Sequence, residues 1–308
     1  MDVKEKVCII TGSAQGLGKE YARVLLENGA RVCLSDLEEV TKLESEASAL
    51  KEFRETFGKE KVCYVKCDVT KEEEFTALFD ETEKYFKVDC IDLLVNNAGI
   101  NGISVGWKKC MDVNILGVMT GTDIALKRMK SSSKKGGSIV NTASMAGLTT
   151  GMGEKAVGYS ASKHGAVILT RTLARDFVRH GVIIKAICPA WTDTNIVASA
   201  KAQAIQLGRL PDLEKRIQNS GGMMTPKHVA HGFYKLVTEC RNGDVMAVIK
   251  DTPYFIVPDD AEVKITILVL MAMLIGRITG NKIIYVSHEK IFTFLFFVFM
   301  IIFINCVY

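Results

Sequence analysis

The stretch Thr11-Gly12-Ser13-Ala14-Gln15-Gly16-Leu17-Gly18 decides the fold, because it joins a short apolar run to an amphipathic one. Residues 7–11 predict a buried strand, and residues 16–28 have helical spacing. Glycine lets the chain turn tightly and lets a ligand approach the backbone. The free N–H groups and the dipole at a helix start favour a pyrophosphate. The stretch therefore predicts a dinucleotide site, although the same glycine spacing also serves ordinary turns.

The alternation of apolar and amphipathic runs continues to about residue 260. Short apolar runs predict strands that are buried on both faces of a parallel sheet, at residues 7–11, 31–35, 62–66, 93–96, 138–142, 183–188 and 247–250. The stretches between them predict helices at residues 16–28, 38–57, 71–86, 108–129, 158–178 and 226–238. Thr70 and Glu73 have the spacing of a capping box. We expect an α/β, doubly wound, seven-stranded parallel sheet in a single domain, residues 1–260.

Charge and cysteine usage exclude several classes of protein. The net charge of +4 is mild and the basic residues are dispersed, so nucleic acid is not a predicted partner. The nine cysteines form no Cys-x-x-Cys pair, and several lie in apolar runs. Free buried thiols are therefore predicted, with no disulfides and no metal site. The charged N-terminus does not resemble a signal peptide, which predicts a cytoplasmic domain.

The last stretch, residues 261–308, differs from the rest of the chain. Residues 291–307 are 17 positions without a charge, and as a helix they would span about 25 Å. Arg277, Lys282 and Lys290 precede this run, which favours a C-terminal membrane anchor with the domain facing the cytosol. Many β-branched and aromatic residues make it a poor helix former in water. A chain end without a role is the alternative interpretation.

Asp36 ends the second predicted strand, where a carboxylate can accept hydrogen bonds from both ribose hydroxyls of a dinucleotide. It would repel a 2′-phosphate, so NAD is predicted in preference to NADP, and a loop-capping role is the alternative. Further cofactor-binding residues are predicted at the same sheet edge, where the third and fourth strands end, namely Asp68, Val69, Asn96, Ala98 and Gly99. Asp68 could touch the adenine or cap the next helix, and Asn96 could brace the sheet.

Tyr159 and Lys163 lie four residues apart, so on a helix they share one face. An ammonium and the positive ring of NAD⁺ both favour a phenolate, so Tyr159 is predicted to take the proton of an alcohol. Ser144 follows the fifth strand and could hydrogen-bond the substrate oxygen, or only cap the next turn. Asn114 falls mid-helix, where asparagine has poor propensity, and could hold a water that relays protons to Lys163.

In order and spacing, the motifs at 11–18 and 96–99 and the four residues Asn114, Ser144, Tyr159 and Lys163 resemble the classical short-chain dehydrogenases/reductases. The resemblance covers residues 3 to 258. It implies a Rossmann-type domain, a catalytic tetrad of these four residues and a dimer or tetramer, of which we expect a homodimer. The cofactor contacts that it implies are Gly12, Gln15, Gly16, Leu17, Gly18, Tyr159, Lys163, Pro189, Thr192 and Thr194. Of the two threonines, spacing favours Thr194 as the contact to the nicotinamide amide.

Residues 159–165 and 186–189 are most similar to NAD-dependent 15-hydroxyprostaglandin dehydrogenases and insect alcohol-dehydrogenase-like members of that family. Residues 154–158 lack the glutamine that the prostaglandin enzymes carry there, which argues against prostaglandin as the substrate. Residues 195–225 take the place of the family's substrate lid. Trp191 either lines the substrate pocket or packs in the core.

The sequence thus predicts NAD-dependent oxidation of a secondary alcohol to a ketone, with Tyr159 as general base. The substrate would be a hydroxy lipid, a prostaglandin-like molecule or another small apolar alcohol. A non-catalytic NAD-binding sensor or a membrane-associated scaffold is the alternative. Such proteins usually lose the tyrosine or the lysine, and both are present here.

Overall fold

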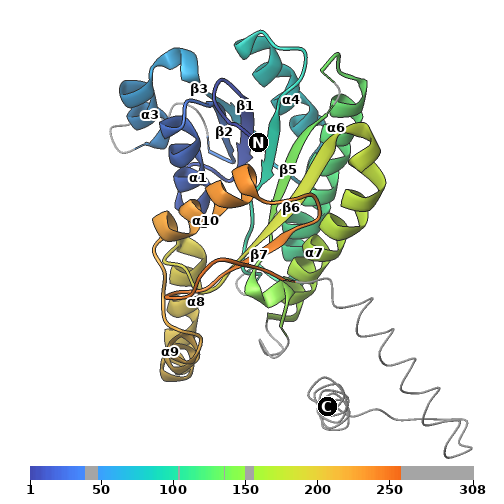
Figure 1. The fold of residues 1–308 in the computed structure, drawn as a ribbon. Coiled ribbons are helices and arrows are strands. Elements are labelled where there is room, and N and C mark those ends of the chain that lie inside the picture. Colours follow the sequence, from blue (N-terminus) through green and yellow to red (C-terminus); the bar gives the residue numbers. More distant parts are fainter. Residues whose placement is uncertain (39–47, 103–104, 135, 150–155, 258–308) are drawn as a thin grey trace, which may run out of the picture. The chain divides into compact units, whose positions relative to one another are not determined.

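One mixed sheet forms the centre of the domain (Figure 1). Its strands are β1 (Val7–Thr11), β2 (Arg31–Asp36), β3 (Val62–Lys66), β4 (Leu93–Asn96), β5 (Gly137–Thr142), β6 (Val182–Pro189), β7 (Val245–Val248) and β8 (Phe255–Ile256). The strand order is β3-β2-β1-β4-β5-β6-β7-β8, and only the β7–β8 pair is antiparallel among the described strands. The predicted seven parallel strands are confirmed. The exposed, two-residue β8 is an addition that has no sequence pattern of its own.

The computed structural model describes residues 1–38, 48–102, 105–134, 136–149 and 156–257. Residues 1–257 form one compact unit. None of the helices in the described ranges combines the length and hydropathy that a membrane span requires. The predicted tail anchor lies outside these ranges. The eight cysteines within them are free thiols, and seven of these are buried, as predicted.

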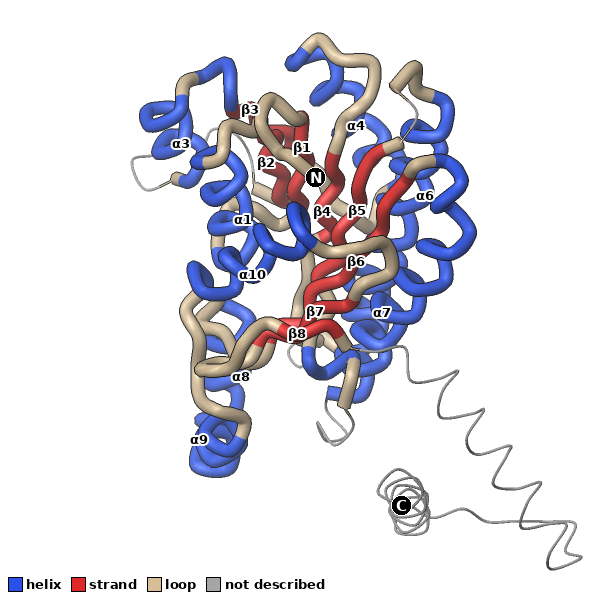
Figure 2. Tube along the Cα trace, in the orientation of Figure 1, coloured by secondary structure: helices blue, strands red, loops and turns tan. Residues whose placement is uncertain are grey.

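Helices cover both faces of the sheet (Figure 2). One face carries α1 (Gly16–Glu27), α3 (Ala49–Phe57) and α10 (Pro226–Glu239), and the other carries α4 (Glu72–Phe86), α6 (Gly117–Ser131) and α7 (Val157–Phe177). Cys8 and Ile10 of β1 belong to the core on the first face, whereas Val7 and Ile9 belong to the core on the second. Strands buried on both sides explain the continuous apolar runs of the sequence.

Helix boundaries differ from the predicted ones at two places. α3 begins at Ala49, where Ser48 accepts a hydrogen bond from Lys51 N at 3.2 Å, and residues 39–47 of the predicted helix lie outside the described ranges. The predicted capping box is wrong, because α4 begins at Glu72 and Thr70 donates its hydroxyl to Asp68 Oδ1 at 2.7 Å. Asp68 N instead donates to Glu74. Short 3₁₀ turns lie at Lys59–Lys61, Met145–Gly147 and Val178–His180.

The predicted helix 108–129 is interrupted by a wider turn. α5 (Trp107–Met111) passes into a π-helical turn at Asp112–Leu116, and α6 follows without a break. Such turns occur often at functional sites. Asn114 lies in the middle of this one.

The order of the strands determines where a ligand-binding crevice forms. It reverses between β1 and β4, so the loops that follow these strands leave a crevice at the carboxyl edge of the sheet. After β6, at the same edge, the chain forms α8 (Asn195–Gln206) and α9 (Leu210–Asn219), where the lid was predicted.

Candidate active site

The glycine-rich loop lies at the crevice between β1 and β4. Gly12 and Gly16 have φ values of +64° and +57°, a region that glycine adopts without steric cost. A Cβ on Gly12 would lie 2.7 Å from Ala98 Cα, so the two loops meet with no side chain between them. Asn97 Nδ2 donates to Thr11 O and Gly12 O, each at 3.0 Å, and fixes the turn. No described side chain caps α1, so its first N–H groups suit a phosphate.

Asp36 is held beside this loop by main-chain donors. Its Oδ2 accepts from Ala14 N at 3.0 Å and its Oδ1 from Leu37 N at 2.9 Å. The carboxylate is half-buried at the end of β2, next to the site that the glycine loop offers to a pyrophosphate. The loop and the carboxylate together fit the adenosine half of a dinucleotide.

Two predicted cofactor residues use their side chains elsewhere. Asn96 is buried, and its Nδ2 donates to Asn141 Oδ1 at 2.9 Å and to Thr122 Oγ1 at 3.1 Å, which braces β4 against β5 and α6. Asp68 accepts from the amide and the hydroxyl of Thr70, before α4. Asn96 thus braces the sheet as predicted, whereas Asp68 closes a turn with Thr70 and does not cap α4, whose N-cap residue is Lys71.

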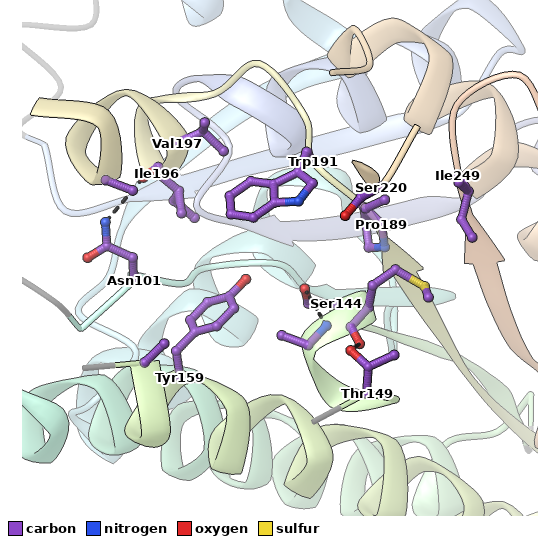
Figure 3. A pocket seen from close by; sticks show the side chains of 15 residues that line it. Asn101, Ser144, Thr149, Tyr159, Pro189, Trp191, Ile196, Val197, Ser220 and Ile249 are labelled. Carbon is purple, nitrogen blue, oxygen red and sulfur yellow. Dashed lines mark hydrogen bonds between the residues drawn. The ribbon is translucent and has the colours of Figure 1, made fainter. Parts of the chain in front are cut away.

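Tyr159 and Ser144 meet at one side of a cavity (Figure 3). Tyr159 belongs to the first turn of α7, and its hydroxyl points into the cavity. Ser144 follows β5, accepts a hydrogen bond from Ala146 N at 3.1 Å and lines the same cavity as the Tyr159 hydroxyl. Burial raises the pKa of Tyr159, and the interaction with the Ser144 side chain opposes that rise. Without further positive charge the phenol therefore keeps its proton at neutral pH.

Lys163 supplies positive charge one turn further along α7. Its Nζ donates to Thr142 O at 2.7 Å and lies 5.7 Å from the centroid of the Tyr159 ring. The side chain is only 4% exposed, and burial lowers its pKa to about 8. Most of the lysine is therefore still an ammonium at pH 7, where it favours ionisation of the nearby phenol.

Asn114 braces the floor of the site. Its Oδ1 accepts from Ile100 N at 2.9 Å, and its Nδ2 donates to Ile100 O at 2.8 Å and to Ser162 Oγ at 3.2 Å. A Cβ on Gly99 would lie 3.3 Å from Asn114 Oδ1 and 3.6 Å from Lys163 Nζ. The four predicted catalytic residues are thus brought together, while the water relay through Asn114 stays a prediction.

The segment after β6 closes over the glycine loop. A Cβ on Gly16 would lie 3.6 Å from Thr194 Cγ2, and the Gln15 amide oxygen accepts from the Asn195 side chain. Thr192 is buried, and its hydroxyl donates to Ala190 O at 3.0 Å. Thr194 is therefore the threonine that lies beside the glycine loop, and its contact with the nicotinamide amide stays a prediction.

The cavity beside Tyr159 has a volume of about 340 Å³ and an apolar lining. Trp191 lies across it from Tyr159, which decides between its two predicted roles in favour of the pocket. Ile196, Val197 and Ala200 of α8 contribute the lid side. The other described lining residues are Asn101, Ser144, Met145, Ala146, Thr149, Ala156, Pro189, Ala190, Ser220 and Ile249.

Two residues of the site were missed by the sequence analysis. Asn97 shapes the glycine loop, and its place in Asn96-Asn97-Ala98-Gly99 was a usable signal. Asn101 donates to Ile196 O at 3.1 Å and to Ser199 Oγ at 2.6 Å, which ties α8 to the loop after β4. No local pattern marks Asn101, because Ile196 and Ser199 lie on α8, almost a hundred residues away.

Comparison with known proteins defines the class. A family model described as short chain dehydrogenase matches residues 6–205. The chain is 33% identical over 254 residues to "15-hydroxyprostaglandin dehydrogenase [NAD(+)]" of Mus musculus, covering 80% of this chain and 91% of that protein. It is 32% identical over 254 residues to "Zerumbone synthase" of Zingiber zerumbet, covering 78% and 90%. The crystal structure of levodione reductase superimposes with a TM-score of 0.70 at 29% identity, covering 80% and 96%.

The chain belongs to the short-chain dehydrogenase family. It is therefore an oxidoreductase that acts with a nicotinamide cofactor. Within the family it is similar to the 15-hydroxyprostaglandin dehydrogenases.

Proposed function

We propose that this protein oxidises a secondary alcohol of a small apolar molecule to a ketone with NAD⁺, and that Tyr159 is the general base. The observation that carries the proposal is the meeting of Tyr159, Ser144 and Lys163 at the side of an apolar cavity. NAD⁺, when bound, accepts the hydride of the carbinol carbon. The alcohol also loses its hydroxyl proton, and this proton needs a base on the protein.

Tyr159 takes that proton at its phenolic oxygen. Burial alone would hold the phenol neutral, so the ammonium of Lys163 is needed to favour the phenolate. Ser144 donates a hydrogen bond to the same oxygen of the substrate and holds it at the phenol as the carbonyl forms. Thr142 O fixes the lysine by accepting its hydrogen bond at 2.7 Å, so the charge stays beside the tyrosine.

The choice of NAD rests on Asp36. Two main-chain amides hold its carboxylate in place, and a 2′-phosphate would meet a fixed negative charge there. The relative from Mus musculus carries NAD(+) in its name, which supports the same cofactor here. An NAD-linked enzyme usually works in the direction of alcohol oxidation, because cells hold far more NAD⁺ than NADH.

We also propose a homodimer that buries an apolar surface on α5, α6 and α7. Five large apolar side chains on these helices and on the π-helical turn at Asp112–Leu116 are between 46% and 63% exposed, namely Trp107, Leu116, Met119, Val157 and Ile168. Exposed patches of this kind mark interaction sites, and a two-fold axis would pair the surface with itself. Light scattering would find a dimer for the natural chain and a monomer for Ile168→Asp. A monomeric natural chain would refute this assembly.

The proposed activity is tested with the full chain, Tyr159→Phe and Tyr254→Phe. Tyr254 is the matched control, because its hydroxyl donates to His228 O at 3.1 Å, away from the cavity. Each protein is given NAD⁺ or NADP⁺ with a panel of secondary alcohols, and NADH or NADPH is followed by absorbance. We expect turnover with NAD⁺ that falls by at least about 1000-fold in Tyr159→Phe alone. Cofactor binding without turnover of any alcohol would favour the sensor or scaffold instead.

A further inference from the structure

Trp191 forms one wall of the cavity on a rigid piece of main chain. It follows β6, and its carbonyl oxygen accepts a hydrogen bond from Met224 N at 2.8 Å. Next to it, the buried Thr192 forms an isolated β-bridge with Met224. The indole ring lies across the cavity from Tyr159, with its nitrogen on the edge toward Ser220 and Pro189 (Figure 3). Its position is thus set by the fold before any substrate arrives.

The indole nitrogen is a donor that cannot accept a hydrogen bond, and within the described residues nothing accepts from it. Two hydroxyl side chains of the cavity lining donate to main-chain carbonyl oxygens. Thr149 Oγ1 donates to Met145 O at 2.9 Å, and Ser220 Oγ donates to Arg216 O at 2.8 Å. An apolar substrate that covered the indole N–H would leave a buried donor unpaired, which is unfavourable.

The remaining lining sets the charge of the ligand. The fifteen lining residues that belong to the described ranges are all neutral, and eleven of them have apolar or aromatic side chains. A carboxylate in this cavity would lose its hydration without gaining a counter-ion from these walls, which is unfavourable. A neutral oxygen acceptor, by contrast, satisfies the indole N–H at little desolvation cost.

We propose that Trp191 determines specificity, and that the substrate is an uncharged apolar alcohol with a second oxygen acceptor, a ketone, ether or ester. The carbinol oxygen lies at Tyr159 and Ser144, and the second oxygen accepts from the indole N–H on the opposite wall. This inference rests on the proposed function, since it names the substrate class of the same site. A site built to donate a hydrogen bond discriminates strongly against analogues that lack the acceptor.

The first test compares alcohols that differ only in the second oxygen. The full chain and Trp191→Phe are assayed with NAD⁺ and 3- or 4-hydroxycyclohexanone, against 3- or 4-methylcyclohexanol. We expect the natural chain to prefer the keto-alcohols by roughly tenfold in kcat/KM, and Trp191→Phe to bring this ratio close to one. An unchanged ratio in Trp191→Phe would overturn the inference.

A closer replacement removes the N–H without changing the shape of the side chain. Only two tryptophans occur in the chain, so in Trp107→Phe the tryptophan analogue benzothienylalanine would enter at position 191 alone. This side chain keeps the bicyclic ring and replaces the N–H by sulfur. It should abolish the preference for keto-alcohols as Trp191→Phe does. If the preference survives, shape and not the hydrogen bond is the cause, and the inference fails.

A binding measurement separates this inference from the proposed function. In Trp107→Phe, Trp191 is the only fluorescent indole, and with NAD⁺ present a ketone cannot be reduced. We expect cyclohexane-1,4-dione to bind roughly tenfold more tightly than 4-methylcyclohexanone and to shift the emission. Equal affinities overturn the inference even if alcohols are oxidised. Tighter binding of the dione without any turnover would refute the proposed function and leave the inference standing.

Cofactor affinity provides the last control. If the indole N–H serves the substrate, Trp191→Phe should bind NAD⁺ with the affinity of the natural chain in calorimetry. A tenfold loss of NAD⁺ affinity would place the donor on the cofactor and refute the assignment to a substrate oxygen.

Discussion

The cofactor end and the substrate end of the crevice are built in different ways. At the cofactor end, glycines and main-chain amides form the surface, and Asn97 and Asp36 bond directly to that main chain. At the substrate end, side chains from β5, α7 and the β6–α8 segment form the walls. A binding surface made of main-chain atoms keeps its shape when side chains are substituted, so it suits a ligand that stays the same. A binding surface made of side chains changes its shape and polarity with each substitution. We expect the first region to determine which cofactor binds, and the second to determine which substrate is accepted.

Two lysines that are buried in the described part of the chain give the largest expected contrast, because Lys163 lies where the two regions meet and Lys185 lies away from the site. Lys185 on β6 donates to Leu236 O at 2.8 Å and to Val237 O at 3.0 Å, at the end of α10. We expect Lys163→Met to lower kcat by about 1000-fold. Lys185→Met should keep turnover and lower the melting temperature. Comparable losses of kcat in both variants would remove Lys163 from the chemistry.

The pH dependence of stability tests the same lysine without any substrate. Burial lowers the pKa of Lys163 to about 8, whereas an unfolded lysine titrates near 10.4. Between these values the unfolded chain binds a proton that the folded chain lacks, so the stability contributed by this group rises with pH. In urea titrations from pH 7 to 10.5, the natural chain should gain about 3 kcal/mol relative to Lys163→Met. A constant difference would contradict the lowered pKa.

Substitutions at Gly12 and Gly208 test how closely the main chain is packed in the two regions. Both have positive φ, but a Cβ at Gly12 meets Ala98, and one at Gly208 meets nothing within 4 Å. Gly12→Ala should therefore weaken NAD⁺ binding by about 100-fold and lower the free energy of unfolding by at least about 2 kcal/mol. Gly208→Ala should cost only about 1 kcal/mol and leave NAD⁺ affinity intact. Equal losses of affinity in calorimetry would show that the loop contact is unimportant.

Asp36→Ser probes the cofactor end alone. Loss of a charge-assisted hydrogen bond costs about 1.5–3 kcal/mol, so kcat/KM for NAD⁺ should fall roughly 30-fold. The value for NADP⁺ should rise, because the repulsion of a 2′-phosphate is removed. The ratio of the best to the poorest alcohol should not change, since the substrate end is untouched. A changed alcohol preference would mean that the two regions are coupled.

Asn101→Ala is the mildest change and affects the substrate end. It removes the hydrogen bonds to Ile196 O and Ser199 Oγ that tie α8 over the cavity. We expect KM for the alcohol to rise about fivefold, with faster hydrogen exchange in Asn195–Gln206. Ser199→Ala removes one of the two bonds and should have a smaller effect. Unchanged exchange in α8 would mean that Asn101 does not hold the lid.

Sequence patterns predicted most of the fold because they are local. The apolar runs of β1 to β6 were confirmed. The predictions were wrong where a sequence pattern was short or where tertiary contacts determined the local structure. β7 begins two residues before its predicted start, and the two-residue β8 was not predicted. In place of the predicted capping box, Thr70 hydrogen-bonds Asp68 in a turn. The π-helical turn at Asn114 also has no counterpart in helical periodicity.

The sequence by itself determined the family, the doubly wound sheet and the four residues of the predicted tetrad. Each of these depends on residue type and on spacing within one strand-to-helix unit. Only the tertiary structure decided that Asn96 braces the sheet, that Asn101 holds α8 and that Trp191 presents an N–H to the cavity. Such roles depend on which distant segments meet, as Asn101 and Ile196 do across 95 residues. Chain folding brings these partners together, and no local sequence pattern predicts which partners will meet.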